Sequence, residues 1–194
     1  MYKRQILECF KHVLKEFGYP PKDDRTIYNT IGMTLVDAFD LLTDMPDNPQ
    51  REDMRKAYVK KADEVMVKKT YFYDDTIAIL QTLQNAGVKV GIVSTKYRYR
   101  IVNTFNEQAG SLPVDIIVGG EDVTKAKPDP QGLDLIIERF GADKSDVLYI
   151  GDSYIDAETA LNSGVDFAGV TTGSTTKEDF EKYPHIYIGS SLLD

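Results

Sequence analysis

Short apolar runs recur along the second half of the chain, and polar stretches with helical spacing separate them. Each run is a near-continuous series of aliphatic residues, which is typical of a parallel strand buried on both faces. The runs cover residues 88–93, 114–118, 147–150 and 165–170, and a shorter run covers residues 186–188. Strands that alternate with helices predict an α/β fold, with a parallel sheet between layers of helices.

The first part of the chain has helical spacing instead. Residues 6–17 place apolar side chains on one face, and a glycine and two prolines end that helix. From about Lys22 to Tyr71 the spacing stays helical and gives no convincing strand. We therefore expect a core domain of residues 1–18 and 74–194. Residues 19–73 would form a small all-helical cap inserted after the first helix, placed to cover one edge of the sheet.

Polar residues come at or soon after the ends of three predicted strands. They are Ser94-Thr95-Lys96, Lys127-Pro128-Asp129-Pro130 and Gly151-Asp152-Ser153-Tyr154-Ile155-Asp156. Ligands of open parallel sheets bind beyond the carboxyl ends of the strands. A hydroxyl, a cation and two carboxylates at that edge are groups that can hold a phosphate and a divalent metal ion.

Each motif also has a purely structural interpretation. Ser94 and Thr95 could cap a helix that follows a strand, and Lys127 could be an exposed lysine in a proline-rich turn. Asp152 could cap the next helix in the same way. The occurrence of all three motifs in this order, each at or shortly after a strand end, favours the phosphate site.

Composition narrows the classes of protein that fit. The 194 residues include 42% hydrophobic and 28% charged residues, as in an ordinary globular protein. The net charge of −8 argues against non-specific nucleic-acid binding, but not against a small phosphorylated substrate. No stretch approaches the roughly 20 apolar residues of a membrane span, and no signal peptide is predicted. With one cysteine, Cys9, we expect a cytoplasmic protein without nucleic-acid or membrane partners.

Because of these motifs and the alternation of strands with helices, the chain resembles the haloacid dehalogenase-like superfamily. The similarity is to its phosphoglycolate phosphatase-like and pyrophosphatase-like branch, which has a helical cap. The resemblance extends from about Ile6 to Leu193. It implies a three-layer Rossmann-like core and a Mg²⁺-dependent phosphatase-type hydrolase. Such an enzyme acts on a small phosphate ester or pyrophosphate through an aspartyl-phosphate intermediate.

The resemblance also assigns roles to individual residues. Ser94 would hold the transferring phosphoryl group, and Thr95 would contribute its backbone N–H. Lys127 would bridge the nucleophile and the substrate phosphate. Asp152 would bind Mg²⁺ directly, and Asp156 would orient the lysine or the water shell of the metal. These groups suit phosphoryl transfer because charge develops on the phosphoryl oxygens.

One motif of that family has no counterpart in the sequence. The family's first strand ends in Asp-x-Asp-Gly-Thr, which supplies the nucleophile and the general acid/base, but none of the five residues before Ile6 is acidic. We therefore expect the first central strand to be missing and this chain to be an N-terminally truncated and nearly inactive form. Loss of a central strand also predicts a chain that aggregates or folds only partly.

Other functions remain compatible with parts of this pattern. A relative that lost its nucleophile naturally would bind phosphate or protein without catalysis. A phosphoacceptor signalling domain also uses Asp, Ser/Thr and Lys around a phosphate, but Asp152 and Asp156 come last here, which disfavours it. Metal-independent dehalogenases are disfavoured by the same two carboxylates, and mutases stay open. The sequence specifies neither the substrate nor the oligomeric state.

Overall fold

The helical part of the molecule is a bundle of four helices. The computed structural model describes residues 4–73 and 75–193, so the ends of the predicted core segments, residues 1–3, 74 and 194, lie outside it. The bundle consists of α1 (Arg4–Glu16), α2 (Asp24–Tyr28), α3 (Leu35–Leu42) and α4 (Arg51–Lys69). Its centre is an aromatic cluster, in which the Phe10 ring lies 5.3 Å from Phe39 and 4.7 Å from Tyr58.

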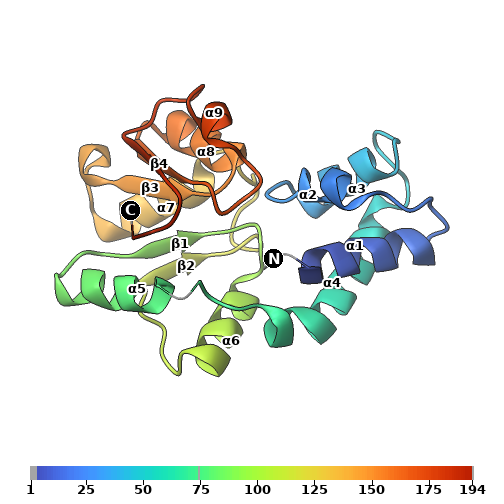
Figure 1. The fold of residues 1–194 in the computed structure, drawn as a ribbon, viewed down its shortest axis with the longest axis horizontal. Coiled ribbons are helices and arrows are strands. Elements are labelled where there is room, and N and C mark those ends of the chain that lie inside the picture. Colours follow the sequence, from blue (N-terminus) through green and yellow to red (C-terminus); the bar gives the residue numbers. More distant parts are fainter. Residues whose placement is uncertain (1–3, 74, 194) are drawn as a thin grey trace.

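The first helix differs from its predicted placement. The sequence assigns residues 1–18 to the core, but α1 packs along α4, and its apolar face joins the cluster of the bundle (Figure 1). Val13 and Leu14 are almost fully buried there. Helical periodicity shows that a face is buried but not which partner buries it. The partner follows from the complementary apolar face of α4.

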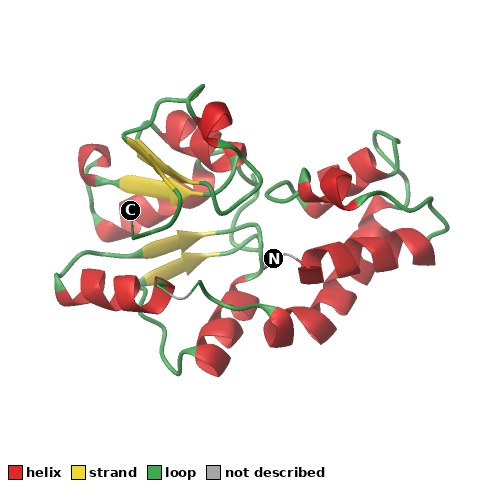
Figure 2. Ribbon diagram, viewed as in Figure 1, coloured by secondary structure: helices red, strands yellow, loops and turns green. Residues whose placement is uncertain are grey.

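The remaining chain alternates helices and strands, which confirms the α/β class. The elements are α5 (Thr76–Asn85), β1 (Gly91–Val93), α6 (Arg98–Gln108), β2 (Ile116–Val118), α7 (Gln131–Phe140), a 3₁₀ turn (Lys144–Asp146), β3 (Leu148–Gly151), α8 (Tyr154–Ser163), β4 (Asp166–Val170), α9 (Lys177–Phe180) and β5 (Tyr187–Gly189). Every strand pairing is parallel, as Figure 2 shows. None of the helices in the described ranges is long and apolar enough to cross a membrane.

The strands form two sheets instead of one. β1 pairs with β2, with Ile92 opposite Ile117, and β3, β4 and β5 pair in that order, with Ile150 opposite Ala168. Helix α7 packs against β1, β2 and α8, while α8 packs against β3 and β4. The helical layer therefore connects two half-sheets, which lie one above the other in Figure 1.

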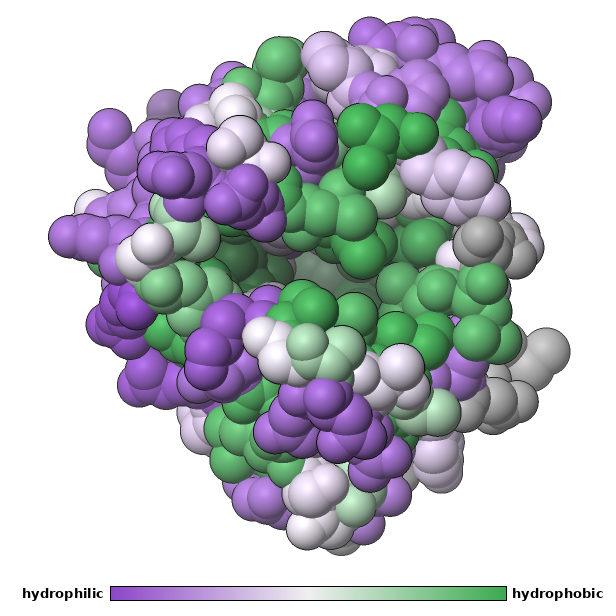
Figure 3. Space-filling view, turned by 90° about the vertical axis from the view of Figure 1, so that its left-hand side faces the viewer, coloured by the Kyte–Doolittle hydropathy of each residue, from purple (hydrophilic) through white to green (hydrophobic). Residues whose placement is uncertain are grey.

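Apolar side chains near the break between the half-sheets are not buried. Leu148 and Ile150 on β3 are 47% and 45% exposed, and Val88 before β1 is 48% exposed. Helix α5 has an apolar face but no fully buried residue. Figure 3, which views the molecule from the left-hand side of Figure 1, shows hydrophobic surface around a depression. Strands of a parallel sheet are normally covered on both faces, so these apolar side chains are unusually exposed.

Candidate functional site

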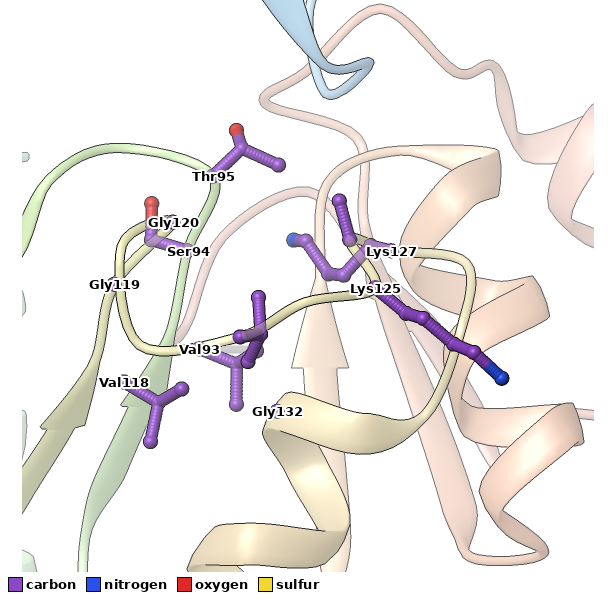
Figure 4. Close-up of a pocket in the computed structure, with 11 residues that line it drawn as sticks. Val93, Ser94, Thr95, Val118, Gly119, Gly120, Lys125, Lys127 and Gly132 are labelled. Atoms are coloured by element: carbon purple, nitrogen blue, oxygen red, sulfur yellow. The ribbon is translucent and has the colours of Figure 1, made fainter.

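The carboxyl end of β1 opens into a small hollow at the edge of the sheet. Ser94 and Thr95 come from the loop after β1, and Lys127 comes from the long loop after β2 (Figure 4). The full lining is Val93, Ser94, Thr95, Val118, Gly119, Gly120, Val123, Lys125, Ala126, Lys127 and Gly132. Three of the residues that the sequence predicts for phosphate binding therefore share one cavity.

Two lysines of the loop after β2 point in opposite directions. Figure 4 shows the Lys127 side chain directed toward the loop that carries Ser94 and Thr95, whereas Lys125 points away from it. The Lys125 side chain is 73% exposed, and its ammonium lies 3.7 Å from Asp129. The Lys127 side chain is only 13% exposed. Lys127 is therefore the cation that faces the predicted phosphate position.

Lys127 is held by an ion pair. Its Nζ lies 2.6 Å from Oδ1 of Asp156 and donates to the hydroxyl of Tyr149 at 3.5 Å. Burial opposes the charge on Lys127, but the attraction of Tyr149 and Asp156 outweighs burial and raises the pKa of Lys127 above its ordinary value. Lys127 therefore stays protonated at neutral pH although its side chain is largely removed from water.

Both carboxylate oxygens of Asp156 are engaged. Oδ1 accepts from Lys127 and from the Tyr149 hydroxyl at 3.2 Å, while Oδ2 accepts from the Ser153 hydroxyl at 2.6 Å and the Ser153 amide at 3.1 Å. Burial alone would raise the pKa of Asp156, but Lys127 and these hydrogen bonds keep it below its usual value. A carboxylate with these four partners suits the lysine-orienting role more than the metal-ligand role.

Asp152 lies between β3 and α8, four residues before Asp156. It directly follows Gly151 at the end of β3, and Ser153, not Asp152, caps α8 through a capping box with Asp156. The loop after β4 lies against it, because a Cβ added at Gly173 would be 1.9 Å from the Asp152 carbonyl oxygen. The residues lining the hollow include neither Asp152 nor Asp156.

The described residues fit Mg²⁺ only in part. Mg²⁺ is bound by one or two carboxylates together with waters and substrate phosphate oxygens, and Asp152 offers one such carboxylate at the correct sheet edge. In the ranges 4–73 and 75–193, no cluster of three or more His, Cys, Asp or Glu side chains is placed to hold a metal ion. The donor set therefore allows Mg²⁺ at Asp152, with the other ligands coming from water and the substrate.

Three residues of this region were missed in the sequence. Tyr149, the only residue with a polar tip in the run 147–150, contacts both members of the ion pair. Burial raises its pKa, so its hydroxyl stays protonated. Gly119 and Gly120 follow β2, and a Cβ at Gly120 would lie 2.6 Å from the Thr95 carbonyl oxygen. The Gly-Gly pair directly after a predicted strand was the available signal for this close approach.

The helical bundle lies against the same edge of the sheets. Gly32 has a φ of +106°, and a Cβ there would meet Ile155 at 3.2 Å and the Ser153 hydroxyl at 3.5 Å. The loop between α2 and α3 therefore contacts the start of α8, next to Asp152 and Asp156. A side chain at residue 32 would push this loop away from the site.

Comparison with known proteins agrees with this arrangement. The sequence model of the haloacid dehalogenase-like hydrolases matches residues 3–170. A pyrophosphatase PpaX from Listeria monocytogenes serotype 4a (strain HCC23) is 28% identical over 191 residues, covering 97% of this chain and 86% of that protein. A phosphoglycolate phosphatase from Shigella boydii serotype 4 (strain Sb227) is 28% identical over 159 residues, covering 82% of this chain and 61% of that protein.

Solved structures give the same result for the fold. A haloacid dehalogenase-like hydrolase from Bacteroides fragilis superposes with a TM-score of 0.95 at 46% identity, covering 98% of this chain and 91% of that one. A haloacid dehalogenase-like protein from Streptococcus pneumoniae, at 20% identity, has a TM-score of 0.86 over 99% and 89% of the two chains and shows the fold alone. The resemblance inferred from the motifs is confirmed: the chain belongs to the haloacid dehalogenase-like hydrolase family.

Proposed function

We propose that this site serves a Mg²⁺-dependent phosphohydrolase for small phosphate esters or pyrophosphate. The observation that carries the proposal is the desolvated ammonium of Lys127, held by Asp156 and directed toward Ser94 and Thr95. A fixed cation beside hydroxyl and backbone donors complements the three oxygens of a phosphoryl group. Because the donors are already oriented, they need no rearrangement as charge develops.

Each residue has a distinct task in this proposal. Ser94 donates its hydroxyl and Thr95 its backbone N–H to phosphoryl oxygens, and Lys127 neutralises their charge. Asp156 positions Lys127 and keeps it protonated. Asp152 holds Mg²⁺, which when bound supplies a second positive charge on the phosphate oxygens.

The proposed reaction needs a nucleophile in addition to the residues that line the hollow. The residues that line the hollow offer hydroxyl and ammonium groups but no carboxylate. We propose that an aspartate on a strand outside the 194 residues supplies it, and that the chain alone binds phosphate without turnover. The alternative is a relative that is nucleophile-free by nature and only binds phosphate or protein.

The substrate class and the cap are part of the same proposal. Relatives are a pyrophosphatase and a phosphoglycolate phosphatase, so we propose a small phosphorylated metabolite as substrate. The bundle that presents Gly32 to the sheet edge would act as the cap that closes over this substrate. We place the protein in the cytoplasm, where its buried thiol, Cys9, stays reduced.

Phosphate binding and turnover test the proposal separately. Titration of the 194-residue chain with inorganic phosphate, with and without Mg²⁺, should show saturable binding in calorimetry. Lys127→Met should abolish it, and Lys125→Met should leave it unchanged. No binding by the unmodified chain would contradict the phosphate site.

Turnover is measured on the protein encoded by the complete reading frame in the genome. If the reading frame continues upstream into an apolar strand ending in Asp-x-Asp, the longer protein should hydrolyse para-nitrophenyl phosphate only with Mg²⁺. Absence of hydrolysis by that longer protein, with phosphate binding intact, would favour the non-catalytic alternative.

A further inference from the structure

We propose that Tyr149 is a positioning residue of the candidate site, and that its hydroxyl directs the Lys127 ammonium toward a bound phosphate. Tyr149 is not among the residues that line the hollow, so it would act through Lys127 and not by touching the phosphate. The inference rests on the proposed function only for the identity of the anion. The direction of the ammonium follows from contacts within the chain.

The first argument is the number of donors on the ammonium. A lysine ammonium has three N–H donors and no acceptor. Oδ1 of Asp156 accepts one at 2.6 Å, and the Tyr149 oxygen accepts a second at 3.5 Å. In the part of the chain that the structure describes, the Lys127 ammonium has no third partner. One N–H therefore remains, and the other two contacts set its direction.

The remaining N–H is directed into the hollow. Lys127 lines the hollow, whereas Tyr149 and Asp156 lie outside its lining. Figure 4 shows the lysine side chain turned toward the loop that carries Ser94 and Thr95. An ammonium held by Asp156 alone would be free to rotate about that one contact. The second contact, to Tyr149, removes this freedom.

The Tyr149 hydroxyl has a well-defined position. Tyr149 lies on β3, opposite Phe167 on β4, and its ring packs against the apolar cluster that contains Phe167 and Phe180. A tyrosine side chain has only two torsions, whereas a lysine has a flexible four-carbon stem. A rigid hydroxyl thus orients the end of a flexible side chain.

A hydroxyl can serve both neighbours at once. It accepts from the Lys127 ammonium and donates to Oδ1 of Asp156 at 3.2 Å, because an ammonium only donates and a carboxylate only accepts. Burial raises the pKa of Tyr149, so the hydroxyl keeps the proton that this arrangement needs. The contact with the ammonium is the longer one, which indicates that Asp156 supplies most of the attraction and Tyr149 the direction.

The chain offers a matched control for the loss of this hydroxyl. Tyr183 packs against the same apolar cluster, and its hydroxyl donates to a carboxylate oxygen of Glu158 at 3.0 Å. Tyr149→Phe and Tyr183→Phe therefore remove the same group from similar surroundings. Only the first of them removes it from the Lys127 ammonium.

Calorimetry with inorganic phosphate compares the two variants. Tyr149→Phe should bind phosphate about tenfold more weakly than the unmodified chain, the change expected when one hydrogen bond to a charged group is lost. Tyr183→Phe should stay within about twofold of the unmodified chain, because its hydroxyl does not contact the ammonium. Normal phosphate affinity in Tyr149→Phe, or an equal loss in both variants, would overturn the proposal.

Lysine side-chain NMR gives a readout that does not need phosphate. The signals of the Lys127 ammonium and its neighbouring methylene are assigned by their absence in Lys127→Arg. Tyr149→Phe should shift these signals and speed the exchange of the ammonium hydrogens with water, whereas Tyr183→Phe should not. An unchanged Lys127 signal in Tyr149→Phe would overturn the proposal.

A second lysine shows whether the effect is local. The ammonium of Lys144 donates to the carbonyl of Ser163 at 2.7 Å and lies 3.1 Å from Asp134, so it is also held by two partners. Its signals should stay unchanged in Tyr149→Phe. Shifts of both lysines would indicate a general structural defect and contradict the positioning role.

Addition of phosphate separates this inference from the proposed function. In the unmodified chain, phosphate should shift the Lys127 signals, because the remaining N–H donates to the anion. Binding of phosphate without such a shift would overturn the proposal. If the Lys127 signals depend on Tyr149 while no phosphate binds, the positioning contact stands and only the proposed function fails.

Discussion

The Nζ of Lys127 lies 2.6 Å from Oδ1 of Asp156, and this ion pair connects the loop after β2 with the first turn of α8. The two side chains are only 13% and 8% exposed. The pair therefore links the two half-sheets and also forms part of the candidate site. Its removal should affect stability and phosphate binding together.

Asp156→Asn should destabilise the fold strongly. The substitution leaves the Lys127 ammonium buried without its counter-charge, which typically costs about 3–5 kcal/mol of unfolding free energy. Urea unfolding measures the loss. Asp129→Asn, at the half-buried partner of the exposed Lys125, is the control and should cost less than about 1 kcal/mol. Equal losses in the two variants would contradict the importance of the buried pair.

The same pair sets the pH range of stability. The pKa of Asp156 is lowered on folding, so its contribution is present above the unfolded value of about 3.9 and is lost as the pH falls through the folded pKa. The pKa of Lys127 is raised, so its contribution is present below about 10.4 and is lost at higher pH. Urea unfolding at a series of pH values should show both losses, and both should diminish in Lys127→Met/Asp156→Leu.

Gly120→Ala should impair phosphate binding. Its Cβ would lie 2.6 Å from the Thr95 carbonyl oxygen, so the loop that carries Ser94 and Thr95 must move. Calorimetry should show at least a tenfold weaker affinity for phosphate. In Gly87→Ala, the new Cβ meets nothing within 4 Å, so only backbone strain at φ +76° is added. That control should lose stability but keep its phosphate affinity.

The helical bundle is attached to the core through a charged cluster on α4 and α6. Asp63 accepts from Arg100 Nε at 2.8 Å and from the Tyr99 hydroxyl, and Arg100 also donates to the carbonyl of Val59. Asp63→Ala should cost about 1–2 kcal/mol, because Arg100 is buried but Asp63 is partly solvated. Limited proteolysis between bundle and core should become faster. Asp53→Ala, at an exposed pair within α4, should change neither result.

Exposed apolar positions beside the break between β1 and β3 should tolerate truncation unusually well. Ile150→Ala, at a 45% exposed residue, should cost less than about 1 kcal/mol, whereas Ile137→Ala, at a 6% exposed residue of α7, should cost about 2–5 kcal/mol. Thermal or urea unfolding compares them. A large cost at Ile150 in the free chain would mean that the residue is already buried.

Much of this fold could be predicted from the sequence because its strands are continuous apolar runs with helices between them. All five predicted strands are present, but β1 begins at Gly91 instead of Val88, because a strand extends only as far as its partner pairs with it. The partner of α1 could not be predicted, since an amphipathic face does not identify what covers it.

The grouping of three candidate residues could be predicted because loops that follow parallel strands meet at one edge of a sheet. Ser94 and Thr95 directly follow β1, and Lys127 lies in the long loop after β2, so all three line the hollow. The role of Asp156 depends on contacts with Lys127 and Tyr149, which come from segments 29 and 7 residues away. No local pattern encodes contacts between separate elements, so Tyr149 was missed and Asp156 was assigned to the metal as well as to the lysine.

Within the described part of the chain, no backbone ladder joins the two half-sheets, so side chains and one layer of helices have to hold them together. Ser94, which lines the hollow, follows the half-sheet of β1 and β2. Lys127 faces it and is paired with Asp156, which belongs to the half-sheet of β3, β4 and β5. An anion bound by Ser94 and Lys127 would therefore link the two half-sheets. Binding of such an anion would then increase the stability of the whole domain against unfolding.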